Sequence, residues 1–174
     1  MVEVTNPRQL TDFLKSLRAV RQFTRQPIPV DIVQDILEVA RWSGSASNRQ
    51  FAEIITVGKR DTLTALSKLA GYVGHLRGAP LGMLLVMPGE WPEGETFDEG
   101  RLAERIMLAA AAHGVGSSIG WFSPAGRGEA KHLLGVPEKR VLRTAISLGY
   151  PAEPPRRGRR KPISELVHEE RYRA

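Results

Sequence analysis

The sequence predicts an α+β or α/β fold in one domain that spans residues 1–174. The length suits a single domain of ordinary size. A content of 41% hydrophobic and 25% charged residues is typical of a globular chain rather than a disordered one. Segments with helical spacing of apolar residues are mixed with short β-branched or continuously apolar segments, and no internal repeat is visible.

Apolar residues at helical spacing predict five helices and a short closing one. In the first helix Leu10, Leu14 and Leu17 share a face, and Asn6 or Thr11 is a candidate cap. The alanine-rich segment 101–113 is apolar on most sides, which predicts a central buried helix. The predicted helices cover residues 9–20, 30–41, 61–69, 101–113, 129–134 and 163–172.

Short β-branched and apolar runs predict about four strands. Residues 53–57 contain Ile, Thr and Val and are followed by a glycine. Residues 80–87 are almost all apolar, which suits a central strand buried on both faces. The other strands are predicted at 117–122 and 143–148. The segment 88–99 is rich in Gly, Pro and acidic residues and is predicted to be a loop.

The excess positive charge lies mostly in one segment. Five basic residues fall within six positions, and without them the net charge of +6 is only +1. Prolines and a glycine interrupt this segment, so we predict a loop suited to clamping a phosphate or another chain, with a solvated charge run as the alternative. Nucleic acid is the first partner that the basic composition suggests. The five residues are Arg156, Arg157, Arg159, Arg160 and Lys161.

Several classes of site are excluded by what the sequence lacks. Without cysteine there are no disulfides, thiolate metal sites, cysteine nucleophiles or iron–sulfur clusters. The four histidines show no metal-ligand spacing, and no nucleophile-elbow or Walker motif is present. No secretory signal is visible in residues 1–11 and no apolar run approaches about 20 residues, so we expect a soluble, cytoplasmic protein without membrane contact.

Two segments are candidates for ligand binding. Arg18 and Arg21 lie three residues apart at the predicted end of the first helix, where both guanidinium groups can face one phosphate. A solvated surface pair is the alternative. In the loop 43–50, small residues allow close approach to a planar ligand, and Asn48 and Gln50 can donate and accept hydrogen bonds. An ordinary connection between helix and strand is the alternative.

A third segment, 114–121, is rich in glycine but does not match a dinucleotide fingerprint, because it follows a helix and its glycines are wrongly spaced.

Taken in order, these segments resemble the FMN-dependent nitroreductase family over nearly the whole chain. The opening segment is similar to that family's Arg-Ser-x-Arg-x-Phe motif, and the polar loop is similar to its Ser-x-x-Asn-x-Gln-Pro segment. Further similar segments follow the alanine-rich helix and close the chain. The matching segments are Arg18-Ala-Val-Arg21-Gln-Phe, Ser45-Ala-Ser47-Asn48-Arg-Gln50, Gly114-Val-Gly-Ser, Leu134-Gly-Val-Pro-Glu, Leu148-Gly-Tyr-Pro-Ala-Glu and Arg160-Lys-Pro-Ile-Ser-Glu.

The resemblance implies an α+β fold with a central, mostly antiparallel sheet of about four to five strands flanked by helices. It also implies an intertwined homodimer with one FMN at each of two subunit interfaces. Both arginine clusters would converge on the flavin phosphate, and the polar loop would approach the flavin from the same or the partner subunit. The implied cofactor-binding residues are Arg18, Ala19, Arg21, Ser47, Asn48, Gln50, Gly120, Trp121, Arg159 and Arg160.

The implied activity is hydride transfer from NAD(P)H through the flavin to a nitroaromatic, quinone or similar small acceptor, with no catalytic side chain. A flavin enzyme of the same fold with another reaction, such as dehalogenation or flavin conversion, is one alternative. A basic anion- or nucleic-acid-binding module without a redox role is the other. The sequence departs from the family pattern at Ala19, where a Ser is usual, and at Phe51 and Ala52, which replace Pro-Trp. The segment between Met87 and Asp98 is also short for the family. By the resemblance it is either a reduced lid with Trp91 stacked on a substrate or a loop with Trp91 packed on the surface.

Overall fold

A four-stranded antiparallel sheet forms the centre of the molecule in the computed structural model, which describes residues 6–155 and 158–172. The strand order is β1-β2-β4-β3, and every neighbouring pair is antiparallel. This arrangement confirms the predicted α+β class and rules out the parallel sheet of an α/β fold. The strands are β1 (Glu53–Val57), β2 (Leu81–Met87), β3 (Gly116–Trp121) and β4 (Val141–Gly149).

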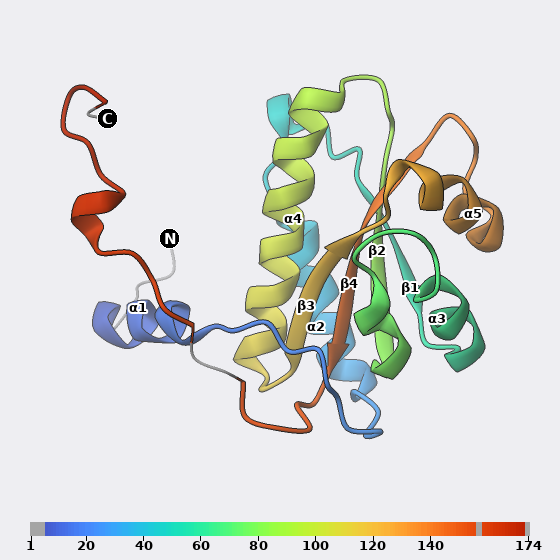
Figure 1. Ribbon diagram of the computed structural model, residues 1–174, viewed down its shortest axis with the longest axis horizontal. Helices are drawn as coiled ribbons and strands as arrows, with labels where there is room; N and C mark the ends of the chain where they lie inside the picture. Colours follow the sequence, from blue (N-terminus) through green and yellow to red (C-terminus); the bar gives the residue numbers. More distant parts are fainter. Residues whose placement is uncertain (1–5, 156–157, 173–174) are drawn as a thin grey trace.

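Helices cover both faces of this sheet (Figure 1). The first core cluster packs α2 (Val30–Arg41) and α4 (Pro92–Ala112) against one face, and the second packs α3 (Arg60–Leu66) and α5 (Pro124–Leu134) against the other. The central strand β2 serves both clusters, because alternate residues point to opposite faces. Its continuous apolar sequence is therefore explained by burial on both sides, as predicted for residues 80–87.

The fourth helix begins much earlier than the sequence predicts. The prediction of a loop at 88–99 is wrong, because α4 starts at Pro92 and most of that segment is helical. Pro92 occupies the first turn, where a missing N–H costs nothing. The carboxylate of Glu95 accepts hydrogen bonds from the backbone N–H groups of Gly89, Glu90 and Trp91 at 2.8–3.0 Å. The acidic composition thus marks a helix N-terminus rather than a loop.

The first helix, α1 (Pro7–Ser16), ends four residues before the predicted boundary at residue 20. Asn6 caps it, since its side chain accepts a hydrogen bond from the N–H of Gln9 at 3.1 Å. At the other end the Arg18 guanidinium donates to the carbonyls of Lys15 and Leu17 at 2.8 and 2.6 Å. The chain then becomes extended, so Arg18 and Arg21 do not share a helix face as predicted.

The closing helix predicted at 163–172 is also wrong, because only a short 3₁₀ turn, η3 (Ile163–Glu165), forms there. Both α1 and the segment around η3 extend away from the sheet and its covering helices (Figure 1). Neither element buries a residue, although Leu10, Leu14, Ile163 and Leu166 are apolar. An apolar segment without a surface to pack against gains little from forming a longer helix.

The remaining boundaries differ little. Helix α2 and strand β1 match the predicted limits, whereas α5 starts at Pro124 instead of residue 129. Two further short 3₁₀ turns are η1 (Ala46–Asn48) and η2 (Gly74–Gly78). No helix among the described residues combines the length and the apolar character needed to cross a membrane.

We predict that Glu95→Gln lowers the free energy of unfolding by about 1–3 kcal/mol, because it removes a buried charged acceptor from three backbone donors. Burial alone would raise the pKa of Glu95, but the three donors and nearby Arg143 outweigh it and lower that pKa. The stabilisation is therefore present at neutral pH and is lost as the pH falls through the folded-state pKa. Urea unfolding of both proteins at pH 7 and at acid pH measures this.

The control is Glu93→Gln, which removes an exposed carboxylate from the same helical turn. It should change the stability by less than about 0.5 kcal/mol. Equal effects of the two substitutions would contradict the assigned role of Glu95.

Candidate functional site

The outer edge of β3 is framed at both ends by chain segments that are distant in sequence. At one end Ala19 forms a parallel bridge with Ser117, and the Val20 N–H donates to the Ser117 carbonyl at 2.8 Å. At the other end the Tyr72 N–H donates to the Trp121 carbonyl at 2.8 Å. Because β3 is the last strand of the sheet, the backbone between these two contacts has no neighbouring strand on this side.

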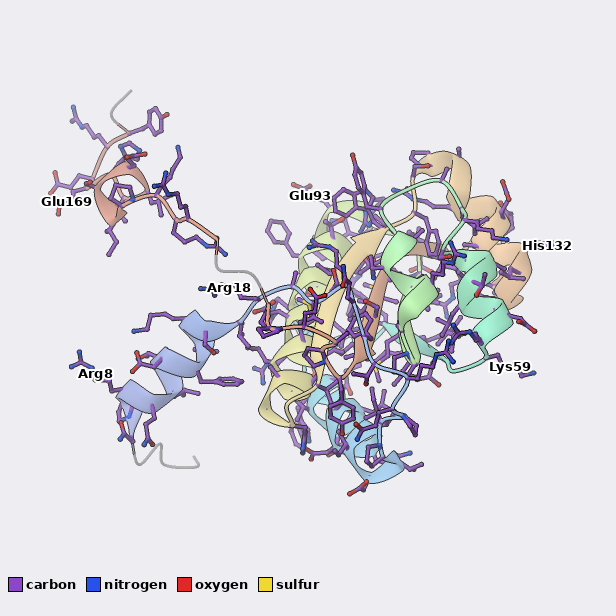
Figure 2. All side chains as sticks on the ribbon, turned by 60° about the horizontal axis from the view of Figure 1, so that its bottom comes forward. Arg8, Arg18, Lys59, Glu93, His132 and Glu169 are labelled. Atoms are coloured by element: carbon purple, nitrogen blue, oxygen red, sulfur yellow. The ribbon has the colours of Figure 1, made fainter. Side chains whose placement is uncertain are left out.

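Three arginines surround a surface hollow of about 430 Å³ beside this edge, here called the arginine depression. Its wall is formed by the segment from Arg18 to Gln22 and by the residues around Gly158 and Arg160. Backbone pairing holds Gln22 to the chain that precedes Gly158, since the Ala152 N–H donates to the Gln22 carbonyl at 3.0 Å. Figure 2 shows Arg18 where the chain passes from α1 to the sheet.

The arginine depression brings together four of the residues predicted from the sequence: Arg18, Ala19, Arg21 and Arg160. Among the described residues, no ion pair joins any of the three guanidinium groups to a carboxylate. Arg18 Nε is buried and has no hydrogen-bond partner in the described chain. Glu153 is the one acidic residue in the wall. The hollow therefore carries net positive charge and suits an anion.

A second, mainly apolar hollow of about 210 Å³ adjoins the first and shares Arg18 and Ala19 with it. It lies between β3 and the second half of α4, and its wall includes Met107, Ser117 and Ile119. Ser118 also lines it, and the hydroxyl of that residue is buried without a partner among the described residues. The two hollows together suit a ligand with an anionic end and a flat apolar body.

The far end of the β3 edge carries Gly120 and Trp121. A Cβ on Gly120 would overlap the Tyr72 carbonyl and lie 2.5 Å from His75 Nε2, so only glycine fits here. Trp121 is half exposed and lies against Tyr72, with ring centroids 4.7 Å apart. The predicted role of Gly120 and Trp121 at the flavin face stays a prediction.

His75 lies behind the same strand in a chain of polar contacts. Its Nδ1 is 2.7 Å from the hydroxyl of Ser147, which is directly opposite Ser118 in the sheet. Burial, and secondly the positive charge of Arg21, lower the pKa of His75. The imidazole is therefore neutral at pH 7. In the described part of the chain, no group of three His, Asp or Glu side chains is placed to hold a metal ion.

The polar loop 43–50, which was predicted to contact the flavin, does not lie beside the arginine depression of its own chain. Asp98, in the first half of α4, accepts a hydrogen bond from the Ala46 N–H at 2.8 Å. The apolar hollow instead contacts α4 at Met107 and Ala111. With a rise of 1.5 Å per residue, these points on the helix are about 14–20 Å apart. One chain therefore does not bring the loop and the arginine depression together.

The loop has an unusual backbone. Three non-glycine residues, Ser47, Asn48 and Gln50, have φ angles of 51–53°, in the left-handed region. The hydroxyl of Ser45 accepts a hydrogen bond from the Gln50 N–H at 2.9 Å and helps to hold this shape. Strained residues of this kind often occur at ligand-binding sites.

Sequence reasoning included some residues that do not line these hollows and missed others that do. Arg159 is exposed and does not line the arginine depression, although its carbonyl accepts a hydrogen bond from Arg160 at 3.0 Å. Arg156 and Arg157 lie outside the described residues. Met107 and Ile119 were missed, and the only available signal for Ile119 was its place in the glycine-rich segment 114–121.

Comparison with known proteins gives a consistent picture. The model of the Nitroreductase family matches residues 14–73. The NADPH-flavin oxidoreductase of Vibrio harveyi is 25% identical over 89% of this chain and 71% of that protein. The NADH dehydrogenase of Thermus thermophilus is 24% identical over 86% of this chain and 90% of that protein.

Solved structures share the fold. The FMN-dependent nitroreductase from Clostridium difficile superposes with a TM-score of 0.80 at 24% identity, over 92% of this chain and 98% of that one. Nitroreductase A from Vibrio parahaemolyticus superposes with a TM-score of 0.85 at 23% identity, over 94% of this chain and 77% of that one. These findings confirm the resemblance to the nitroreductase family that the ordered motifs predict, and the chain has the fold of that family.

Proposed function

We propose that this protein is an FMN-dependent oxidoreductase that takes electrons from NAD(P)H and passes them to a nitroaromatic, a quinone or a similar small acceptor. The observation that carries this proposal is the arginine depression and the apolar hollow, which adjoin each other along β3. The names of the relatives point in the same direction. We propose a single domain that acts in the cytoplasm.

The residues of the arginine depression fit the phosphate end of FMN. A phosphate monoester carries nearly two negative charges, and bidentate hydrogen bonds from arginine are the strongest that a side chain offers it. Arg18, Arg21 and Arg160 have no carboxylate partner among the described residues, so they need not give up an ion pair to bind it. Ala19 has no hydroxyl, and only its backbone can take part.

The β3 edge fits the flat part of the cofactor. Ile119 and Met107 offer apolar contact. Bound FMN would supply the hydride chemistry itself. The chain then has to hold the cofactor, keep the phosphate neutralised and leave one face open to small molecules, which fits a site without a catalytic acid or base.

A second copy of the chain would complete the site. In one chain, Ser47, Asn48 and Gln50 lie at the opposite part of α4 from the arginine depression. In addition, α1 and the segment around η3 leave apolar side chains exposed, with Ile163 77% accessible. We propose an intertwined homodimer in which these two extensions pack on the partner and the polar loop of one chain approaches the FMN bound by the other.

We predict that Arg18→Ala and Arg160→Ala each weaken FMN binding by about 1.5–3 kcal/mol per charged hydrogen bond lost, which is roughly 10- to 150-fold. Quenching of flavin fluorescence during titration of the apoprotein measures the dissociation constant. Arg160→Ala is the cleaner test, because Arg18 also donates to the end of α1.

The matched control is Arg60→Ala. Its neighbour Lys59 lies on the side of the molecule remote from Arg18 (Figure 2). FMN affinity should be unchanged in this variant. Parent-like affinity in both depression variants would rule out the assigned phosphate site.

We predict that mixed dimers of two defective variants regain one strong FMN site per dimer. One variant carries Arg18→Ala and Arg160→Ala, and the other carries Asn48→Gly and Gln50→Gly. Glycine removes the amide groups but tolerates the left-handed φ angles of 53° and 51°. If the site is shared between chains, one site of the mixed dimer collects all four changes and the other none.

The mixed dimer is prepared with two affinity tags, and its strongly bound FMN is compared with that of each parent variant. Strong binding by about half of the chains is the expected result. No recovery would show that each chain supplies its whole site alone.

A further inference from the structure

One turn of α4 holds the first half of the polar loop 43–50. The carboxylate of Asp98 accepts a hydrogen bond from the Ala46 N–H at 2.8 Å. Three residues further along the helix, the guanidinium of Arg101 lies over Gly44, where a Cβ would overlap it. The two side chains also attract each other, because a guanidinium nitrogen of Arg101 lies 3.6 Å from the Asp98 carboxylate. The loop is therefore attached to α4 at two successive points.

The second half of the loop is attached to the start of the same helix. The guanidinium of Arg49 lies 5.6 Å from the centre of the Trp91 ring, and Trp91 directly precedes α4. This contact between a cation and an exposed ring is weaker than a hydrogen bond to a buried carboxylate. Asn48 thus lies between two attached parts of the loop, and Gln50 follows the second one directly.

Asp98 makes the strongest of these contacts because it is buried. The residue is only 5% exposed, whereas the side chain of Arg101 is 57% exposed. A buried carboxylate loses its hydration, and here the Ala46 N–H and the charge of Arg101 compensate for that loss. Without the carboxylate, the Ala46 N–H loses its acceptor, which costs more than the loss of an exposed contact.

The backbone of the loop depends on such support. Ser47, Asn48 and Gln50 have left-handed φ angles, which residues other than glycine adopt only at a cost in free energy. A segment of this kind keeps its shape where contacts with the rest of the structure determine it. Without these contacts the loop would adopt other shapes, and each binding event would have to order it again.

We propose that Asp98, supported by Arg101, is a positioning residue for the shared FMN site. It keeps the loop of one chain in the shape in which Asn48 and Gln50 reach the FMN bound by the other chain. The inference rests on the proposed function, and it adds that the affinity for FMN depends on a buried carboxylate that does not touch the cofactor. A defect at Asp98 therefore acts on the partner's site.

Titration of the full-length apoprotein with FMN measures the effect on affinity. Asp98→Ala should weaken FMN binding about 5- to 30-fold, because the Ala46 N–H loses its acceptor. Asp98→Asn keeps an oxygen that can accept this hydrogen bond, and its affinity should stay within about 3-fold of the parent. The matched control is Asp61→Ala, which removes an exposed carboxylate from the first turn of α3 and should leave the affinity unchanged.

Hydrogen exchange of the Ala46 amide tests the attachment without any flavin. We expect faster exchange in Asp98→Ala than in the parent, and parent-like exchange in Asp98→Asn. An unchanged rate in Asp98→Ala would show that Asp98 does not hold the loop. The proposal would then be wrong, whatever the protein binds.

Mixed dimers show on which site Asp98 acts. One chain carries Asp98→Ala, and the other carries Arg18→Ala and Arg160→Ala. If the loop serves the partner's FMN, one site has intact arginines and an intact loop, so about half of the chains should bind FMN strongly. If Asp98→Ala instead damages the hollow of its own chain through α4, both sites are defective. The absence of any strong site would therefore overturn the proposal.

If Asp98→Ala fails to fold, Arg101→Ala replaces it, since this side chain is largely exposed. It should weaken FMN binding about 2- to 5-fold. Adding Gly44→Ala should cause no further loss, because both changes remove the same contact.

The failure of this inference differs from the failure of the proposed function. Parent-like affinity in Asp98→Ala, or in Arg101→Ala where that variant replaces it, would overturn the positioning role while the parent still binds FMN. A folded parent that binds no FMN would overturn both.

Discussion

The pairing of the segment after α1 with the outer edge of β3 determines the geometry of the candidate site. The Val20 N–H donates to the Ser117 carbonyl at 2.8 Å, and Gly116 makes this approach possible because a Cβ there would lie 2.8 Å from the Cβ of Val20. This pairing fixes Arg18 and Ala19 beside the sheet. The same extended segment continues to Gln22, whose carbonyl pairs with Ala152, so the chain that leads to Arg160 arrives at the same place.

A second constraint acts through α4, which connects the two candidate regions. Arg143 on β4 forms an ion pair with Glu99 of α4. Glu95 of α4 accepts hydrogen bonds from the backbone just before the helix. These buried carboxylates fix the first turns of α4 to the sheet. Asp98 in the same turns holds the polar loop through the Ala46 N–H. The other half of α4 forms one wall of the apolar hollow. A rigid helix thus keeps the loop and the arginines apart within one chain, which is the physical reason for proposing a dimeric site.

Local patterns predicted the elements that depend on local physics. Helix α2 and strand β1 have the limits expected from apolar periodicity and from β-branched residues. Predictions from the sequence were wrong where a contact with a distant part of the chain determines the local structure. Arg18 and Arg21 were expected on one helix face, but pairing with β3 keeps that segment extended. The N-terminal half of α4 was taken for a loop, because the capping role of Glu95 is visible only when its three backbone donors are known.

The residues of the candidate site could be predicted only in part, because distant contacts also determine which residues line it. Arginines at Arg18, Arg21 and Arg160 were expected to meet, and they line one depression. That expectation came from the family resemblance and not from spacing, because some 140 residues separate the two segments. Met107 and Ile119 were not foreseen, since their place beside the depression follows from how α4 lies against the sheet.

The most direct test of the proposed flavin site is the absorption spectrum of the purified protein after incubation with FMN and removal of the free cofactor. The account predicts the visible bands of a bound flavin, with one FMN per chain. These bands should bleach when NADH or NADPH is added without oxygen and return when a nitroaromatic or a quinone follows. A folded protein that stays colourless after this treatment would contradict the account.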